Sequence, residues 1–221
     1  MHEKKRVYIV VKTYPTISTE YAELVCTAGV LEDGSWIRLY PVPFRLLSDD
    51  QKYPKYTWIE VDAERNTSDF RLESFRPDIS TMVVEPKPDK VDWDERRRII
   101  FKNKQVHTNL QTLIDEAKSP SKTSLAVFKP TRILDFVVES GDRGWDKKKL
   151  ESLQNQSRQL NLFKTMEEIE EEFRVVQKVP YKFSYRFEDD SGRQSTLMID
   201  ERLNVYSRRL QFRQTFMEKA C

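Results

Sequence analysis

The chain has 221 residues, and its 38 basic and 36 acidic side chains leave a formal net charge of only +2. Hydrophobic residues make up 38% and charged residues 33%, a balance typical of globular proteins rather than of disordered tails. No overall excess of positive charge indicates a nucleic-acid ligand, so a function of that kind must depend on local patches.

The sequence excludes a membrane span and a disulfide framework. No apolar run approaches the roughly twenty residues that cross a bilayer, and residues 1–6 lead directly into a β-like run without a signal-peptide core. The two cysteines, Cys26 and Cys221, cannot build a disulfide framework, which fits a reducing compartment. We therefore expect a cytoplasmic protein without a membrane partner.

The first third of the chain is dominated by β-branched and apolar runs. Residues 6–12 predict a buried opening strand, and residues 21–31 and 36–42 predict a hairpin whose turn contains Asp33 and Gly34. Three more short strands are expected over residues 56–62, 70–75 and 79–85. Five or six short strands in succession predict a small β-barrel.

The rest of the chain mixes helical and β signals. Asp92 is expected to cap a helix over residues 93–105, and a second helix is expected over 108–117. Strands follow over 125–128 and 131–139, then a helix after Gly144, a hairpin from 181–187 to 195–199, and a final helix from Asp200. The predicted fold class is α+β, with a barrel-like domain over 1–88 and a helical and hairpin region over 89–221 that can pack with it as one unit.

The predicted strand over residues 36–42 carries the first candidate binding face. Alternation along the strand places Trp36, Arg38 and Tyr40 on one side, where aromatic rings could stack bases and the guanidinium could hold phosphate. We expect this face to be extended by Lys12, Tyr14 and Arg45. The alternative is that Arg38 only covers the two aromatic rings in a structural cation–π contact.

A second basic surface is predicted in the last part of the chain. Lys182 and Arg186 share one face of the strand over 181–187, and Arg208 and Arg209 lie on the predicted final helix. More basic residues occur on the helix over 93–105. The alternative is that a chain with 33% charged residues simply places arginines on solvated faces.

No sequence motif indicates a catalytic, metal or cofactor site. The chain lacks CxxC, HExxH, a P-loop and a glycine-rich dinucleotide motif, so we expect no metal and no cofactor. Asp78, Glu85 and Lys87 imitate the PD…ExK pattern of magnesium-dependent nucleases. However, Pro86 would interrupt the strand that has to present Glu85 and Lys87. We expect a binding protein rather than an enzyme.

Four motifs resemble those of an uncharacterised prokaryotic protein family. They are KTYP at residues 12–15, CTAG at 26–29, WIRLYPVPFR at 36–45 and PYKFSYRF at 180–187. The resemblance implies no activity. It suggests a setting in a larger system, such as antiviral defence or a mobile element.

The leading hypothesis is a nucleic-acid-binding accessory subunit of such a system, with DNA or RNA as its ligand. One alternative is a protein-interaction subunit that docks a larger effector protein through exposed aromatic residues and the acidic run over 167–172. The second alternative is a magnesium-dependent nuclease that uses the PD…ExK-like residues.

Overall fold

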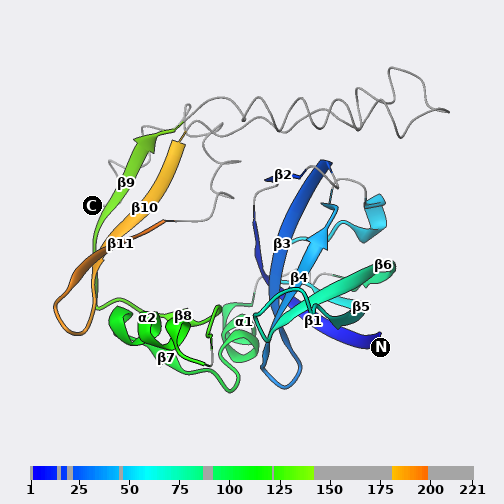
Figure 1. Cartoon of the computed structure of the whole chain (residues 1–221), viewed down its shortest axis with the longest axis horizontal. Helices are drawn as coiled ribbons and strands as arrows, with labels where there is room; N and C mark the ends of the chain where they lie inside the picture. Colours follow the sequence, from blue (N-terminus) through cyan, green and yellow to red (C-terminus); the bar gives the residue numbers. More distant parts are fainter. Residues whose placement is uncertain are drawn as a thin grey trace.

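The computed structural model describes residues 2–13, 16–18, 22–44, 47–86, 92–120, 122–141 and 181–198. Within these ranges the fold is α+β, with more strand than helix, as the sequence predicts. Figure 1 shows a barrel at one end of the molecule and a smaller sheet at the other, with short helices between them. No helix in these ranges is long and apolar enough to cross a membrane.

Five strands close the N-terminal sheet into the barrel that the sequence predicts. They are β1 (Glu3–Lys12), β3 (Ala22–Leu31), β4 (Trp36–Val42), β5 (Trp58–Arg65) and β6 (Ser74–Val84). Their order around the barrel is β1-β5-β6-β4-β3, and β1 also pairs with β3. The short β2 (Thr16–Ser18) extends this sheet beside β3.

The order of these strands defines the topology of the barrel. If β2 is left out, β1, β3, β4, β5 and β6 are the first to fifth strands of the barrel. The second strand then lies between the first and third, and the fifth lies between the third and fourth. All pairs are antiparallel except β4 with β6, which are the third and fifth strands. This is the strand order of the OB-fold, a five-stranded Greek-key barrel.

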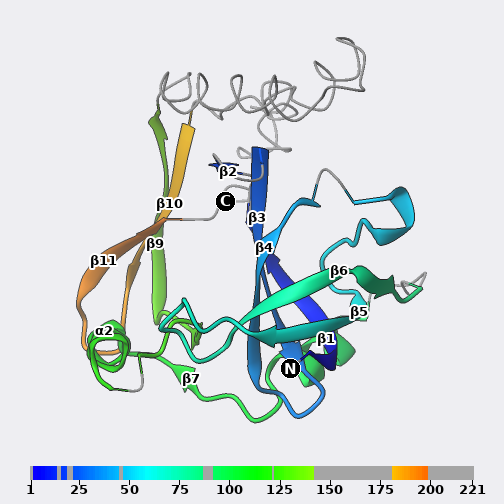
Figure 2. The ribbon, with the colours of Figure 1, turned by 45° about the vertical axis from the view of Figure 1, so that its right-hand side comes forward.

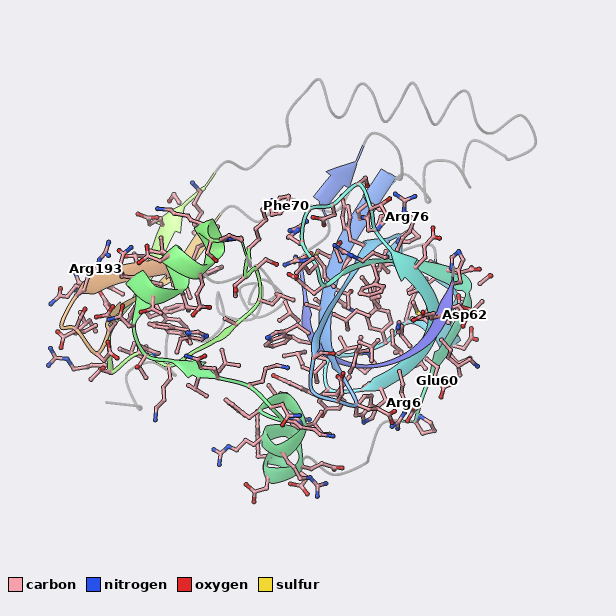
Figure 3. All side chains as sticks on the ribbon, turned by 60° about the horizontal axis from the view of Figure 1, so that its bottom comes forward. Arg6, Glu60, Asp62, Phe70, Arg76 and Arg193 are labelled. Atoms are coloured by element: carbon pink, nitrogen blue, oxygen red, sulfur yellow. The ribbon has the colours of Figure 1, made fainter. Side chains whose placement is uncertain are left out.

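Aliphatic side chains from every barrel strand fill the interior. Val7, Ile9, Ile37, Leu39 and Ile59 are each 0% exposed, which is where most of the hydrophobic stabilisation of this part arises. Figure 3 looks along the barrel and shows the strands as a ring around this core. The 3-10 helix η2 (Asp49–Gln51) lies in the β4–β5 connection, and the Gln51 amide donates to the Ile79 carbonyl.

The predicted hairpin between β3 and β4 is confirmed. Gly34 adopts a φ of 88°, and its N–H donates to the Leu31 carbonyl across the turn. Residues 70–75 and 79–85, in contrast, are not two strands: β6 is continuous over Ser74–Val84 and contains Pro77. Among the described residues, β6 pairs with β4 at Ser74 and Phe75 and has no further strand partner on this side, where a proline is tolerated.

The first predicted helix forms, but it is shorter than expected. Asp92 accepts hydrogen bonds from the N–H groups of Asp94 and Glu95 and caps α1 (Trp93–Ile100) as predicted. The helix ends before residue 105 because Asn103 has a φ of 53°, which is incompatible with a right-handed helix.

The described residues of the second part of the chain form one helix and two small sheets. α2 (Leu110–Lys118) replaces the helix predicted over 108–117, and Asn109 is its N-cap. β7 (Val106–His107) and β8 (Val127–Phe128) form a parallel pair. β9 (Arg132–Ser140), β10 (Tyr181–Glu188) and β11 (Gln194–Met198) form an antiparallel sheet beside the barrel (Figure 2). The predicted helices after Gly144 and from Asp200 lie outside the described residues.

The pairing of β10 with β9 is irregular near the end of the strand. A register shift between Arg186 and Phe187 marks a bulge, and Phe187 packs against Phe128 with ring centroids 5.2 Å apart. Tyr181 and Tyr185 remain 37% and 41% exposed. The shift skips Leu134, so the extra residue lies on β9, and Phe187 is the residue of β10 that packs against β8.

Two aspartates attach the β10–β11 turn to the start of α2. Asp189 accepts from the Leu110 N–H, and Asp190 accepts from the side chains of Thr108 and Asn109. Asp189 also accepts from Ser191, both from its N–H and from its hydroxyl. The two carboxylates therefore stabilise the β10–β11 turn and hold it against the start of α2.

We predict that Gly29→Ala destabilises the barrel. A Cβ at Gly29 would lie 2.4 Å from the Tyr8 carbonyl oxygen and 2.7 Å from a Val7 methyl group, so two paired backbones would have to separate. Overpacking of this kind costs about 1–3 kcal/mol. Gly192→Ala is the control, because its Cβ would meet nothing within 4 Å and only its φ of 77° is unfavourable, at roughly 1 kcal/mol. Urea unfolding of both variants measures the difference, and equal midpoints would contradict it.

We predict that Asp189→Asn reduces the acid sensitivity of the fold. The hydrogen bond from the Ser191 hydroxyl, followed by those from backbone N–H groups, lowers the pKa of the Asp189 carboxyl. A carboxyl whose pKa is lower in the folded than in the unfolded state stabilises the fold at any pH above its usual pKa of about 4. This stabilisation is lost as the pH falls to the pKa of the folded state. The variant should be less stable at pH 7 and should lose less stability on acidification. Urea unfolding at pH 7 and at an acidic pH measures both effects. The control is Asp50→Asn, at an exposed position of η2, which should unfold like the wild type under both conditions.

Candidate nucleic-acid interface

The outer side of β4 carries the three residues that the sequence predicts for it. Ile37 and Leu39 are both 0% exposed inside the barrel, so alternation directs Trp36, Arg38 and Tyr40 outward. Tyr40 is the most open of the three, with 37% of its surface exposed. The predicted alternation along this strand is confirmed.

Arg38 connects the barrel to the segment after α2. Its Nη1 donates to the Cys26 sulfur at 3.1 Å, and its Nη2 donates to the Ser124 hydroxyl at 3.1 Å. Ser124 in turn donates to the Glu73 carboxylate. The buried Nε of Arg38 has no hydrogen-bond partner among the described residues. Arg38 is thus held in place by weak neutral acceptors, and its positive charge is not paired with a carboxylate by any of these bonds.

Trp36 is covered by a lysine rather than by Arg38. The Lys104 ammonium lies 4.5 Å from the centroid of the indole ring, which is a cation–π distance. Burial lowers the pKa of Lys104, and the Asp33 carboxylate partly opposes this effect. The Trp36 ring is therefore contacted by the Lys104 ammonium, and Tyr40 is the more accessible aromatic ring of β4.

The loop over residues 66–73, between β5 and β6, adds an exposed aromatic side chain near this strand. Phe70 is 67% exposed, with the Lys122 ammonium 5.1 Å and the Arg71 guanidinium 5.8 Å from its ring centroid. Arg71 is neutralised by bidentate hydrogen bonds to Asp69, which lower the pKa of that carboxyl. Lys122 is therefore the more available cation of the two.

Arg76 is exposed on β6, the strand that pairs with β4, and within the described residues no ion pair of its side chain occurs. Figure 3 shows Phe70 on the side of the ring turned toward the second part of the chain, and Glu60 and Asp62 on the far side. Residues of β4, β6 and the neighbouring loops form a surface that we call the strand–loop face. It consists of Arg38, Tyr40, Phe70, Arg76 and Lys122.

Lys12 lies inside the end of the barrel. It is only 4% exposed, its ammonium donates to the Tyr53 carbonyl at 2.9 Å, and it lies 3.3 Å from the centroid of the Phe44 ring. These contacts give Lys12 a structural role at the end of the core. The structure does not bring it to the outer side of β4, where Trp36, Arg38 and Tyr40 lie.

Lys182 and Arg186 both face acidic residues across the second sheet. Lys182 pairs in register with Glu139, and Arg186 pairs with Asp135, with an N–O distance of 3.7 Å. The positive charge of this strand is therefore balanced locally. Four other predicted ligand residues lie outside the described residues; they are Tyr14, Arg45, Arg208 and Arg209.

Asp78 and Glu85 of the PD…ExK-like pattern are not brought together, and Lys87 lies outside the described residues. Asp78 and Glu85 are seven positions apart along one extended segment, which corresponds to roughly 20 Å. Asp78 accepts from Ser80, and Glu85 binds Arg6 through both carboxylate oxygens. No group of three potential metal ligands occurs within the described ranges.

Phe70, Arg76 and Lys122 were not recognised from the sequence. Residues 70–75 have the composition of a strand, which conceals a loop residue with an exposed ring. The signal that could have identified the loop is the sequence Asn66-Thr67-Ser68-Asp69, because such residues form turns. Asn66 and Asp69 do accept turn hydrogen bonds from Ser68 and Arg71.

Comparison with family models divides the chain into two parts. Residues 3–102 match the Domain of unknown function (DUF8758), and residues 105–218 match the Domain of unknown function (DUF8757). The second match covers more than half of the chain. The chain belongs to the DUF8757 family. Both families are described without a function, which confirms the resemblance to uncharacterised proteins, and no curated protein or solved structure matches the chain.

We predict that Lys12→Met lowers stability without weakening nucleic-acid binding. Methionine keeps the length of the side chain but leaves the buried Tyr53 carbonyl without its donor, a loss of about 1–3 kcal/mol. Urea unfolding and anisotropy titration of an oligonucleotide measure the two effects. Lys4→Met, on the same strand but 72% exposed, is the matched control. Unchanged stability with weaker binding would instead assign Lys12 to the ligand.

Proposed function

We propose that the chain is a nucleic-acid-binding accessory subunit of a larger prokaryotic system in the cytoplasm, and that the strand–loop face holds single-stranded DNA or RNA. The observation that carries this proposal is the exposure of the Tyr40 and Phe70 rings, with the Lys122 ammonium 5.1 Å from the Phe70 ring centroid and Arg76 on the strand that pairs with β4. In OB-fold barrels, the second and third strands and the loop between the fourth and fifth bind oligonucleotides or oligosaccharides. Here those elements are β3, β4 and the loop over 66–73.

The chemistry of this face suits a single strand better than a duplex. Unpaired bases expose flat surfaces that stack on aromatic rings, at about 1–3 kcal/mol per base. The Phe70 ring is 67% exposed on the loop over 66–73, and the Tyr40 ring is 37% exposed on the outer side of β4. Cations beside the rings can contact the phosphates between stacked bases.

Two single substitutions test the proposal by fluorescence anisotropy with labelled single-stranded DNA and RNA across a salt series. Phe70→Ala should weaken binding about 5- to 150-fold, the equivalent of one lost stacking contact. Lys122→Ala should weaken it less and should reduce the slope of log K against log salt by about 0.7. The apolar control is Leu197→Ala and the basic control is Arg132→Ala, both on the second sheet.

The same titrations also distinguish nucleic-acid binding from a function in docking a protein partner. Binding that weakens with salt and with both strand–loop variants supports it. Absent or salt-independent binding of the wild type to every DNA and RNA form would refute it.

A second candidate function is docking of a protein partner on the β9–β11 sheet. Tyr185 lies opposite Leu197 and Phe136, and Phe183 lies opposite Val138, so these side chains share one face. Leu197 and Val138 are about half exposed, at 50% and 51%. An apolar face of this kind favours a protein contact. Size-exclusion chromatography with the products of neighbouring genes, using wild type and Leu197→Glu, examines it.

A further inference from the structure

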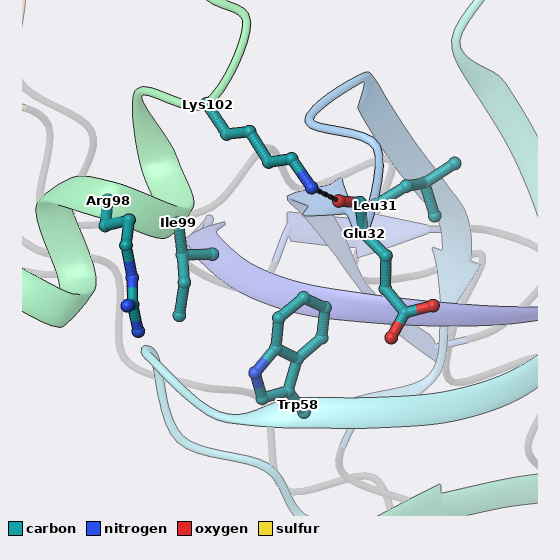
Figure 4. A pocket seen from close by; sticks show the side chains of 6 residues that line it. All are labelled: Leu31, Glu32, Trp58, Arg98, Ile99 and Lys102. Atoms are coloured by element: carbon teal, nitrogen blue, oxygen red, sulfur yellow. Dashed lines mark hydrogen bonds between the residues drawn. The ribbon is translucent and has the colours of Figure 1, made fainter.

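A pocket of about 440 Å³ lies between α1 and the outer wall of the barrel, and its lining shares no residue with the strand–loop face (Figure 4). The barrel contributes Leu31, Glu32 and Trp58, and the helical segment contributes Arg98, Ile99 and Lys102. Its volume lies at the lower end of the range for small-molecule sites, about 300–1,000 Å³, which suits a ligand of the size of one nucleotide.

Hydrogen bonds fix the walls of this pocket. Arg6 donates to both carboxylate oxygens of Glu85 at 2.6 and 2.9 Å and to the Glu32 carboxylate at 2.7 Å. Its guanidinium also lies 4.3 Å from the centroid of the Trp58 ring. On the helical side, Lys102 and Asn103 donate to the backbone carbonyls of Glu32 and Asp33. The β3–β4 turn and the end of α1 are therefore held together around the opening.

The lining combines an apolar slot with charges of both signs at its edge. The side chains of Trp58 and Ile99 form the apolar part, and Figure 4 shows the indole between the helix and Glu32. The Lys102 ammonium has three N–H donors, and one bonds to the Glu32 carbonyl. Arg98 is 79% exposed, and its nearest carboxylate, that of Glu95, is 3.8 Å away. Figure 4 shows Lys102 directed toward the Glu32 carbonyl and Arg98 on the other side of Ile99, so Arg98 is the cation placed to bind an anionic group at the entrance.

The Glu32 carboxylate supplies acceptors inside this arrangement. Arg6 binds its Oε1, and a carboxylate has acceptor sites on two oxygens, so it can still accept from a ligand. Among bases, guanine presents two neighbouring N–H donors on one edge, which match a carboxylate, and uracil presents one.

We infer that this pocket binds one nucleoside monophosphate unit, with the base in the slot against Trp58 and the phosphate at Arg98. Guanine is the preferred base because of Glu32. The unit can be a free nucleotide or the terminal nucleotide of a strand, since both present the same base and phosphate. The inference does not rest on the strand–loop face.

The test is titration of the full chain with GMP and UMP, followed by tryptophan fluorescence and calorimetry. We expect saturable binding, tighter for GMP than for UMP. Arg98→Ala should weaken GMP binding about tenfold, and Ile99→Trp should abolish it by filling the slot. Arg97→Ala is the matched control, because this exposed neighbour does not line the pocket. Phe70→Ala should leave GMP binding unchanged, which separates this site from the strand–loop face.

Two further arms identify the base contact and the source of the nucleotide. Glu32→Gln should reduce the preference for GMP over UMP, because the amide keeps only one acceptor. A 5′-phosphorylated oligonucleotide that begins with guanosine should displace GMP if the pocket takes strand ends, and should fail to displace it if the pocket takes free nucleotides only. The inference is overturned if neither mononucleotide nor this oligonucleotide binds at millimolar concentration, or if Arg98→Ala and Ile99→Trp bind GMP as the wild type does.

Discussion

Strand β1 pairs with β3 along one edge and with β5 along the other, and this double pairing closes the barrel. Close approach of β1 and β3 is possible because Gly29 has no side chain to meet the Tyr8 carbonyl. Once the ring is closed, Val7 and Ile9 are buried in the core, and the side chains of Arg6 and Tyr8 lie on the outer wall. The pocket beside α1 depends on this outer wall, and the strand–loop face depends on the outer side of β4 and β6.

The two walls of the pocket differ in how they are stabilised. The barrel wall rests on a core of fully buried aliphatic side chains, each worth about 1.5–3 kcal/mol. α1 has no buried residue, and it is attached by contacts with the Tyr56 ring, whose centroid lies 4.3 Å from the Arg96 guanidinium and 6.3 Å from the Trp93 ring centroid. Exposed cation–π contacts contribute about 0.5–1 kcal/mol each. The helix can therefore adjust to a ligand while the barrel wall stays fixed.

The features that could be predicted from the sequence are those that depend on neighbouring residues. Gly34 specifies the β3–β4 turn, and alternation specifies that Ile37 points inward and Arg38 outward. The burial of Lys12 could not be predicted, because the register of β1 against β3 shifts between Ile9 and Val11 and ends the simple alternation. The pocket was not predictable either, since Glu32, Trp58 and Arg98 meet only through the tertiary fold.

The outer side of the barrel is only partly available to a nucleic acid. Ala28 and Val30 pair in register with Arg38 and Trp36, yet they are 2% and 0% exposed, so the β3 side of this surface is already covered. A bound strand would therefore cross from Tyr40 toward the loop over 66–73. Arg38 lies at the border, where a phosphate would replace the Ser124 hydroxyl. That hydroxyl is neutral, whereas a phosphate oxygen forms a charge-assisted bond that is roughly twice as strong, so the exchange favours the bound state.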